Sequence, residues 1–192
     1  MSKSDQVYAY TASKIKYLQS IADTGSGKGF LAELRHGIGK NPGELPSLWC
    51  IIFDGMPEEL LGKSGSSYAE QAVYTALTLY ALHQQGNSES MNRPDISIGK
   101  AAYHIAKNED DEQRIINRLN LVVTAVSADD ASRQLRGLVQ LLKSESVPLD
   151  YALLAKQLYL FNYPDSAAEI KLSWGRDFYY EKFNKFKSNE SN

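Results

Sequence analysis

Helical periodicity is the feature that most constrains the fold of this chain. Over residues 67–85 the side chains are apolar around nearly the whole circumference of a helix. One stripe is formed by Ala69, Ala72, Val73, Ala76, Tyr80 and His83, and a second row beside it by Leu77, Leu79 and Leu82. A helix that is apolar on most sides belongs at the centre of a bundle. The sequence contains no Val/Ile/Thr alternation and no Asn-Gly hairpin signal. We therefore predict an all-α fold, a helical bundle of about eight or nine helices.

The remaining helices are predicted from apolar spacing, caps and breakers. We expect Gly25-Ser26-Gly27 to break the first helix and Gly37 to end the second as a C′ glycine. Later helices are expected to be capped by Ser97, Ser127 and Asp150. Asp130 would complete a capping box with Ser127, and Leu149 and Leu154 would form a hydrophobic staple around Asp150. Residues 37–46 and 54–66 are predicted loops, and the tail after Phe186 is expected to fray. The predicted helices cover residues 8–22, 30–35, 47–53 (with Pro46 at the first position), 67–85, 97–107, 109–126, 127–144, 150–163 and 164–186.

The length of 192 residues suits one domain or two small ones. A polar loop at 87–95, which contains Pro94, is a candidate boundary between two lobes. A single all-helical domain spanning 1–192 fits the sequence equally well, and the sequence does not separate the two.

Residues that could perform catalysis or bind metal are scattered. Cys50 is the only cysteine, which excludes an internal disulfide, and we expect it to act as a small core residue. His36, His83 and His104 lack metal-ligand spacing, and His83 is expected to be half-buried and hydrogen-bonded. The acids of 109–112 suit a helix N-terminus better than a metal site. We therefore predict a protein that is not an enzyme and needs neither cofactor nor metal.

The glycine-rich stretch 25–29 (GSGKG) is a weak match to a phosphate-binding loop. It lacks the first glycine, which Ala22 replaces, and the hydroxyl that binds magnesium, and a predicted helix rather than a strand precedes it. We interpret it as a turn between helices that exposes Lys28.

The N-terminal residues contain no apolar signal-peptide core, and no run approaches the length of a membrane span. We expect a cytoplasmic protein with no membrane partner.

Basic side chains are concentrated in bands although the whole chain carries a net charge of -2. Arg133, Arg136, Gln140 and Lys143 share one face of a predicted helix, turned about a third of a circumference from its apolar stripe of Leu135, Leu138, Val139 and Leu142. On the preceding helix Arg114 and Arg118 lie one turn apart. Two helices joined by a tight turn lie antiparallel, so these arginines can line one surface.

These bands have two interpretations. Surface charge is common, so an ordinary solvated face with scattered ion pairs is one of them. The other is a phosphate-binding surface, because arginine matches phosphate oxygens with two parallel hydrogen bonds. The near absence of acids on the stripe from Arg133 to Lys143 favours phosphate binding. Our candidates, in decreasing order, are Arg114, Arg118, Arg133, Arg136 and Lys143; then Arg35, Lys40, Arg93 and Lys100; and last Lys28.

Several segments, taken in order, resemble the small subunit of the type I-E CRISPR Cascade surveillance complex, the CasB family. In that family a second arginine often replaces His36, and an aromatic often stands where this chain has Ile115 and Ile116. The matching segments are 31–37 (LAELRHG), 42–44 (PGE), 72–84 (AVYTALTLYALHQ), 97–99 (SIG), 114–119 (RIINRL), 133–143 (RQLRGLVQLLK), 149–151 (LDY) and 174–179 (WGRDFY).

The resemblance implies an all-helical, non-enzymatic subunit that is present in two copies in the complex. It would pack between the crRNA-bound backbone subunits and the large subunit, and help to hold the guide and target strands and the displaced strand of an R-loop. Such binding is expected to be independent of sequence and sensitive to salt.

Two other functions remain open at this stage. A helical scaffold that binds only protein would use the basic stripe against an acidic partner surface. A small helical nuclease would need a carboxylate or histidine cluster, and the sequence offers none.

Overall fold

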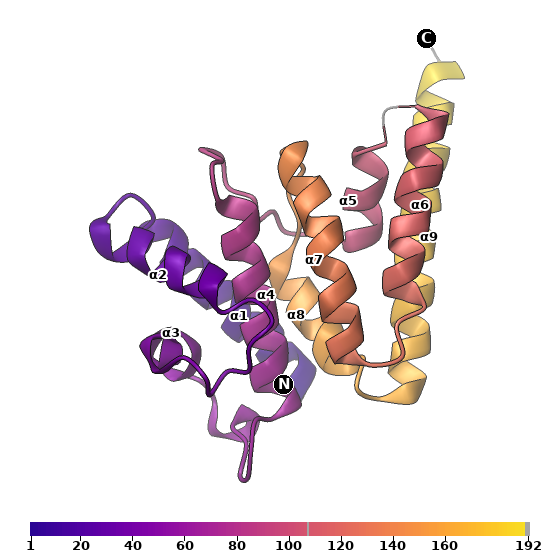
Figure 1. Ribbon diagram of the computed structural model, residues 1–192. Coiled ribbons are helices and arrows are strands. Elements are labelled where there is room, and N and C mark those ends of the chain that lie inside the picture. Colours follow the sequence, from indigo (N-terminus) through magenta and orange to yellow (C-terminus); the bar gives the residue numbers. More distant parts are fainter. Residues whose placement is uncertain (107, 191–192) are drawn as a thin grey trace.

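The structure is a computed structural model that describes residues 1–106 and 108–190. Figure 1 shows an assembly of helices without a sheet, and the all-α prediction is confirmed. Within the described residues there are nine α-helices and two short 3₁₀ helices, namely α1 (Lys3–Ser20), α2 (Gly25–His36), η1 (Pro46–Leu48), α3 (Trp49–Phe53), η2 (Glu58–Leu60), α4 (Tyr68–Gln84), α5 (Ile98–His104), α6 (Glu109–Val123), α7 (Ala128–Ser144), α8 (Tyr151–Leu160) and α9 (Pro164–Glu190).

Helix α4 occupies the centre of the fold, as its apolar girth predicts, and α1, α2, α7 and α8 pack around it (Figure 1). A capping box starts it: Ser67 Oγ accepts from the Glu70 N–H at 3.0 Å, and Glu70 Oε2 accepts from the Ser67 N–H at 2.7 Å. The helix ends before Gly86, whose φ of 83° is in the left-handed region that glycine favours.

A second group, α5, α6 and α9, lies to the right in Figure 1. Helix α5 approaches α9 closely because Gly99 has no side chain: a Cβ there would lie 2.0 Å from the carbonyl oxygen of Trp174. The Ser97 hydroxyl, which caps α5, also donates to the carboxylate of Asp177 on α9. Trp174 is fully buried and its indole N–H donates to Gln157 on α8 at 2.9 Å, which joins the two groups.

One cluster of buried apolar side chains runs from Val7 on α1 to Phe178 on α9. It draws on every α-helix of the described chain. Across these same residues, no helix has the length and hydropathy that a transmembrane segment requires.

The predicted break at Gly25-Ser26-Gly27 is wrong, because these residues form the first turn of α2. Thr24 caps this helix by accepting from the Gly27 N–H at 3.0 Å. A Cβ on Gly27 would lie 1.9 Å from the Ile21 carbonyl oxygen, so glycine lets α2 start directly against the end of α1. Tight packing, rather than chain flexibility, explains this glycine.

Helix α2 ends at His36, so the predicted end at Gly37 is confirmed, but Gly37 does not adopt the left-handed conformation of a C′ glycine. Its φ is -75°, an ordinary helical value. A Cβ at Gly37 would lie 2.5 Å from the Tyr74 hydroxyl, which donates to the Gly37 carbonyl at 2.9 Å. Here glycine makes room for a tyrosine from α4.

Several smaller predictions also fail. Helix α6 ends at Val123, so Val126 falls in the turn and is 91% exposed instead of lying on the apolar stripe. Helix α9 continues to Glu190 instead of fraying after Phe186. Cys50 is exposed, because the face of the short helix α3 that it shares with half-exposed Trp49 points away from buried Ile51 and Ile52. Helix α5 ends at His104, and the predicted end at Lys107 lies outside the described residues.

The caps at Ser97, Ser127 and Asp150 are confirmed. Their side-chain oxygens accept from the N–H groups of Lys100, Asp130 and Leu153 respectively. The capping box at Ser127 is only half formed, since Asp130 Oδ2 accepts from the Val126 N–H instead of that of Ser127.

Two helical glycines provide a matched test of the packing between α5 and α9. Gly99→Ala forces a Cβ against the backbone of Trp174 and should lower the free energy of unfolding by about 1–3 kcal/mol. Gly175→Ala meets no atom within 4 Å and should raise it by roughly 0.5–1 kcal/mol. Urea unfolding followed by circular dichroism measures both, and equal effects of the two substitutions would contradict the close approach.

Candidate nucleic-acid interface

Helices α6 and α7 form an antiparallel hairpin that brings the predicted arginines onto neighbouring helices (Figure 1). Asn108 caps α6 by accepting from the Asp111 N–H at 2.8 Å. The apolar stripe of α7 is buried as predicted, with Leu135, Leu138 and Leu142 fully inaccessible. Because this stripe faces the core, the polar stripe that includes Arg133 and Arg136 faces solvent.

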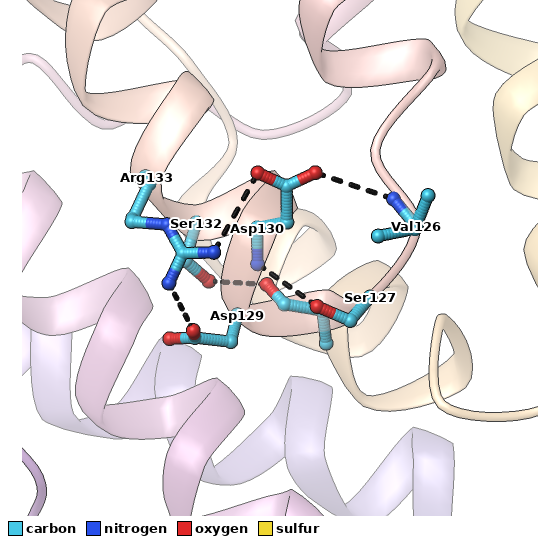
Figure 2. Close-up of polar contacts among 7 residues, drawn as sticks. Val126, Ser127, Asp129, Asp130, Ser132 and Arg133 are labelled. Carbon is cyan, nitrogen blue, oxygen red and sulfur yellow. Dashed lines mark hydrogen bonds and ion pairs between the residues drawn. The ribbon is translucent and has the colours of Figure 1, made fainter.

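Arg133 is paired with two acids of its own helix. Figure 2 shows its guanidinium between Asp129 and Asp130, with Nη1 directed at the Asp129 carboxylate and Nη2 3.7 Å from Asp130 Oδ1. The stripe from Arg133 to Lys143 has few acids of its own, but Arg133 is paired from the preceding turn, because residues three and four positions earlier lie beside it on a helix. Such exposed pairs contribute little to stability, but they do neutralise part of the local charge.

Arg118 lies across the face of α7. Its Nη1 is 3.2 Å from the position that a Cβ on Gly137 would occupy, so the guanidinium rests where α7 has no side chain. Gly137 lies one turn after Arg133 and next to exposed Arg136. In the described part of the chain, neither Arg118 nor Arg136 forms an ion pair with a carboxylate. We call Arg118 and Arg136 the α6–α7 ridge.

Arg114 lies one turn before Arg118 on α6, and its Nη2 is 2.9 Å from Asp111 Oδ1. This pair is i,i+3 within the first turns of the helix, and the arginine side chain is 66% exposed. Arg114 thus shares the helix of the ridge but already has a carboxylate partner.

Two lysines, Lys143 and Lys40, lie near the two ends of α7. Lys143 Nζ donates to Gln85 Oε1 at 2.9 Å, which ties the end of α7 to the end of α4. Lys40 lies near the start of α7, where it lines a small pocket together with Asp129 and Ser132. Its Nζ is 3.0 Å from His36 Nε2.

The other predicted cations lie on other elements. Arg35 and Lys28 belong to α2 and line a pocket between α1, α2 and the end of α4. Arg93 is exposed on the segment before α5, where its backbone N–H donates to the Leu149 carbonyl. Lys100 Nζ donates to the Asp95 carbonyl at 3.1 Å, so its contacts tie it to this segment and not to the ridge.

The residues considered for catalysis do not form a cluster. In the portion of the chain that the structure describes, no group of three His, Cys, Asp or Glu side chains is placed to hold a metal ion. His83 is fully buried, not half-buried as predicted, and its Nδ1 is 2.9 Å from the Tyr151 hydroxyl. Burial lowers the pKa of His83 to about 4, so it is neutral at physiological pH.

Two features of this surface do not follow from local sequence patterns alone. Gly137 interrupts a strongly amphipathic helix, and a glycine there signals close approach by another group; here that group is Arg118. The hydrogen bond between Lys143 and Gln85 joins residues 58 positions apart, so no local sequence pattern predicts it.

Comparison with known proteins identifies the family of the chain. The sequence profile of the family described as CRISPR-associated protein Cse2 matches residues 30–179, more than half of the chain. The chain belongs to the Cse2 family. The crystal structure of CasB from Thermobifida fusca is 30% identical, with a TM-score of 0.78 over 90% of this chain and 97% of that one.

Two more distant structures share the fold. CasB from Thermus thermophilus is 19% identical, with a TM-score of 0.65 over 93% of this chain and 99% of that one. A chain of a structure described as a CRISPR RNA-guided surveillance complex is 17% identical, with a TM-score of 0.75 over 95% and 99%. No curated protein sequence matches the chain.

Three of the segments that suggested this family from sequence contribute to the packing of the fold. In 31–37 the last residue is Gly37, which admits Tyr74, and in 97–99 the last is Gly99, which admits α9. In 174–179, Trp174 is the buried link to α8, and Asp177 accepts from Ser97.

The buried state of His83 predicts a pH dependence of stability. Its pKa is about 4 in the fold and 6.5 in an unfolded chain, so the unfolded state binds more protons between these values and stability falls as the pH falls. Between about pH 7.5 and about pH 5 this group should account for a loss of about 2 kcal/mol. In urea unfolding, the wild type should lose that much more than His83→Gln; equal losses would contradict a buried neutral imidazole.

Proposed function

We propose that this Cse2-family chain is a non-catalytic subunit of a type I-E CRISPR surveillance complex. In this role it binds nucleic-acid backbone without sequence specificity and stabilises the R-loop, both the guide–target duplex and the displaced strand. Its family membership and its structural likeness to a chain of an RNA-guided surveillance complex support this proposal.

The observation that carries the nucleic-acid part of the proposal is the α6–α7 ridge. Arg118 is held against Gly137 beside exposed Arg136, and neither is paired with a carboxylate in the described residues. An unpaired guanidinium can form two hydrogen bonds with one phosphate. Lys143 and Lys40 extend positive charge toward both ends of α7, while Arg114 and Arg133 must exchange an intramolecular partner for a phosphate.

A modest interaction is sufficient for this role. The RNA–DNA hybrid in an R-loop is about as stable as the DNA duplex that it replaces, so a few backbone contacts can shift the balance. Contacts to phosphate release counterions, which makes this contribution dependent on salt and independent of base sequence. An acidic protein with a local basic ridge is suited to hold a strand without retaining nucleic acid indiscriminately.

The partners that follow from this proposal are the backbone subunits and the large subunit of the complex, target DNA and a second copy of the chain, all in the cytoplasm. No catalytic group, cofactor or metal enters the proposed role. A protein-binding scaffold is the second candidate. It is favoured by exposed aromatic side chains on α9, where Tyr180 is 63% and Phe183 69% exposed.

Neutralising the ridge separates the two candidates. Arg118→Gln with Arg136→Gln should weaken binding of the full chain to single-stranded DNA of any sequence and flatten the salt slope by up to about two units. The control is Lys3→Gln with Lys63→Gln, which removes equal charge from exposed residues of α1 and the loop after η2. Electrophoretic shift across a salt series, repeated with the guide-RNA-bound complex and an R-loop target, gives the measurement. An unchanged slope in both settings would favour the scaffold.

The position of Arg118 can be tested without removing its charge. Gly137→Leu fills the space in which its guanidinium rests, so strand binding should fall about as far as in Arg118→Gln. In the Arg118→Gln background the same leucine should have no further effect, because the displaced group is already absent. Independent, additive losses from the two substitutions would show that the contact with Gly137 does not position Arg118 for binding.

A further inference from the structure

A pocket of about 430 Å3 lies between α1, α2 and the end of α4, away from the α6–α7 ridge. One wall is a face of α2, where Lys28, Leu31 and Arg35 recur at steps of three and four. The opposite wall is formed by the end of α4 and the segment 85–90. This volume falls within the range of small-molecule sites in proteins.

The wall opposite α2 is fixed by hydrogen bonds. Gln84 Nε2 donates to the carbonyls of Asn87 and Glu89, both at 2.9 Å, and Gln84 Oε1 accepts from the Met91 N–H at 2.9 Å. Asn87 is held in turn by the His83 carbonyl. The pocket therefore exists before any ligand arrives, which reduces the ordering that binding would require.

Arg35 provides the strongest attraction for an anion in this pocket. Its guanidinium is partly buried, and partial burial lowers the pKa of Arg35. Among the described residues its guanidinium forms one hydrogen bond, a long one with Nη1 3.5 Å from the Ala81 carbonyl. Within the described residues no carboxylate pairs with Arg35 or with Lys28. An anion that enters the pocket would supply the counter-charge that this partly buried cation lacks among the described residues.

The rest of the lining suits a nucleoside better than a bare anion. Leu31 and Ala22 offer apolar surface to a flat ring. The Gln85 amide oxygen accepts from Lys143, and the NH2 group of the same amide can donate to the edge of a base. Asp23, which also lines the pocket but lies beyond ion-pair distance of both cations, can accept from an amino or hydroxyl group.

We propose that this pocket binds a single nucleotide, with its phosphate on Arg35 and Lys28 and its base toward Gln85. The inference deepens the proposed function, on which it rests, because one nucleotide of a strand would have a defined binding site next to Lys143 at the end of α7. Binding through an amide edge and a phosphate requires one nucleotide to leave the stack, which single strands permit at little cost.

Calorimetric titration of the full chain with adenosine 5′-monophosphate, inorganic phosphate and adenosine tests the proposal at low salt. The nucleotide should bind with a stoichiometry of one, and more tightly than either fragment. Arg35→Gln should weaken it by about tenfold or more, since a charge-assisted hydrogen bond is lost, and Lys63→Gln should leave it unchanged. Thermal unfolding of Arg35→Gln verifies that the variant is folded. Equal affinity for inorganic phosphate, or binding insensitive to Arg35→Gln in a folded variant, would overturn the assignment.

A competition experiment identifies the source of the nucleotide. A short single strand that displaces the bound mononucleotide assigns the pocket to a strand, whereas a strand that binds without displacing it assigns the pocket to free nucleotides. The ridge variant Arg118→Gln with Arg136→Gln should retain mononucleotide binding. If Arg35→Gln leaves mononucleotide binding unchanged while strand binding still depends on the ridge, only this inference is refuted. If Arg35→Gln weakens mononucleotide binding but strand binding does not depend on the ridge, only the proposed function is refuted.

Discussion

The burial of α4 on nearly every side is the constraint on which the rest of the structure depends. A helix with alanines at 69, 72, 76 and 81 allows its neighbours to approach closely, and this chain uses that room to pack α1, α2, α7 and α8 around it. Polar atoms that are buried with it need partners, and His83 Nδ1 finds one in the Tyr151 hydroxyl, which links α4 to α8. Because α2 and α7 both rest on α4, its position also sets where the pocket and the ridge lie.

The architecture follows from periodicity more reliably than the boundaries do. Apolar stripes with a step of three or four predicted every long helix, and the caps at Ser97, Ser127 and Asp150 were identified from local chemistry. Two of the errors concern glycines. Gly27 lies inside α2 rather than in a break, with the Ile21 carbonyl where a Cβ would stand, and Gly37 ends α2 without a left-handed φ, beside the Tyr74 hydroxyl. Such contacts are tertiary, so no local rule could have distinguished them from flexible turns.

The candidate site shows the same division. Helical spacing predicted that Arg133 and Arg136 face solvent, but it did not predict which cations would be free. Asp129 and Asp130 pair with Arg133 because one turn of helix brings them alongside it, whereas Arg118 rests on the bare backbone of Gly137 and has no carboxylate partner among the residues that the structure describes. Fold geometry therefore divides a set of arginines that are equivalent in the sequence into paired and unpaired members. The unpaired ones are those that can bind phosphate without first giving up a partner.

This division also bears on the proposed binding of nucleic acid by a chain with a net charge of -2. Long-range attraction is weak for such a protein, so binding relies on short-range contacts within a Debye length, about 8 Å at physiological salt. Two unpaired arginines on a ridge, with lysines at either end of α7, give few phosphate contacts and hence low affinity for any free strand. Low intrinsic affinity is an advantage for a subunit of an assembly, because a strand already held nearby raises the effective concentration, and the same contacts then become sufficient. Under the proposed function, the acidic remainder of the surface would limit binding outside that setting, so the sparse ridge and the negative net charge would together make binding conditional on assembly.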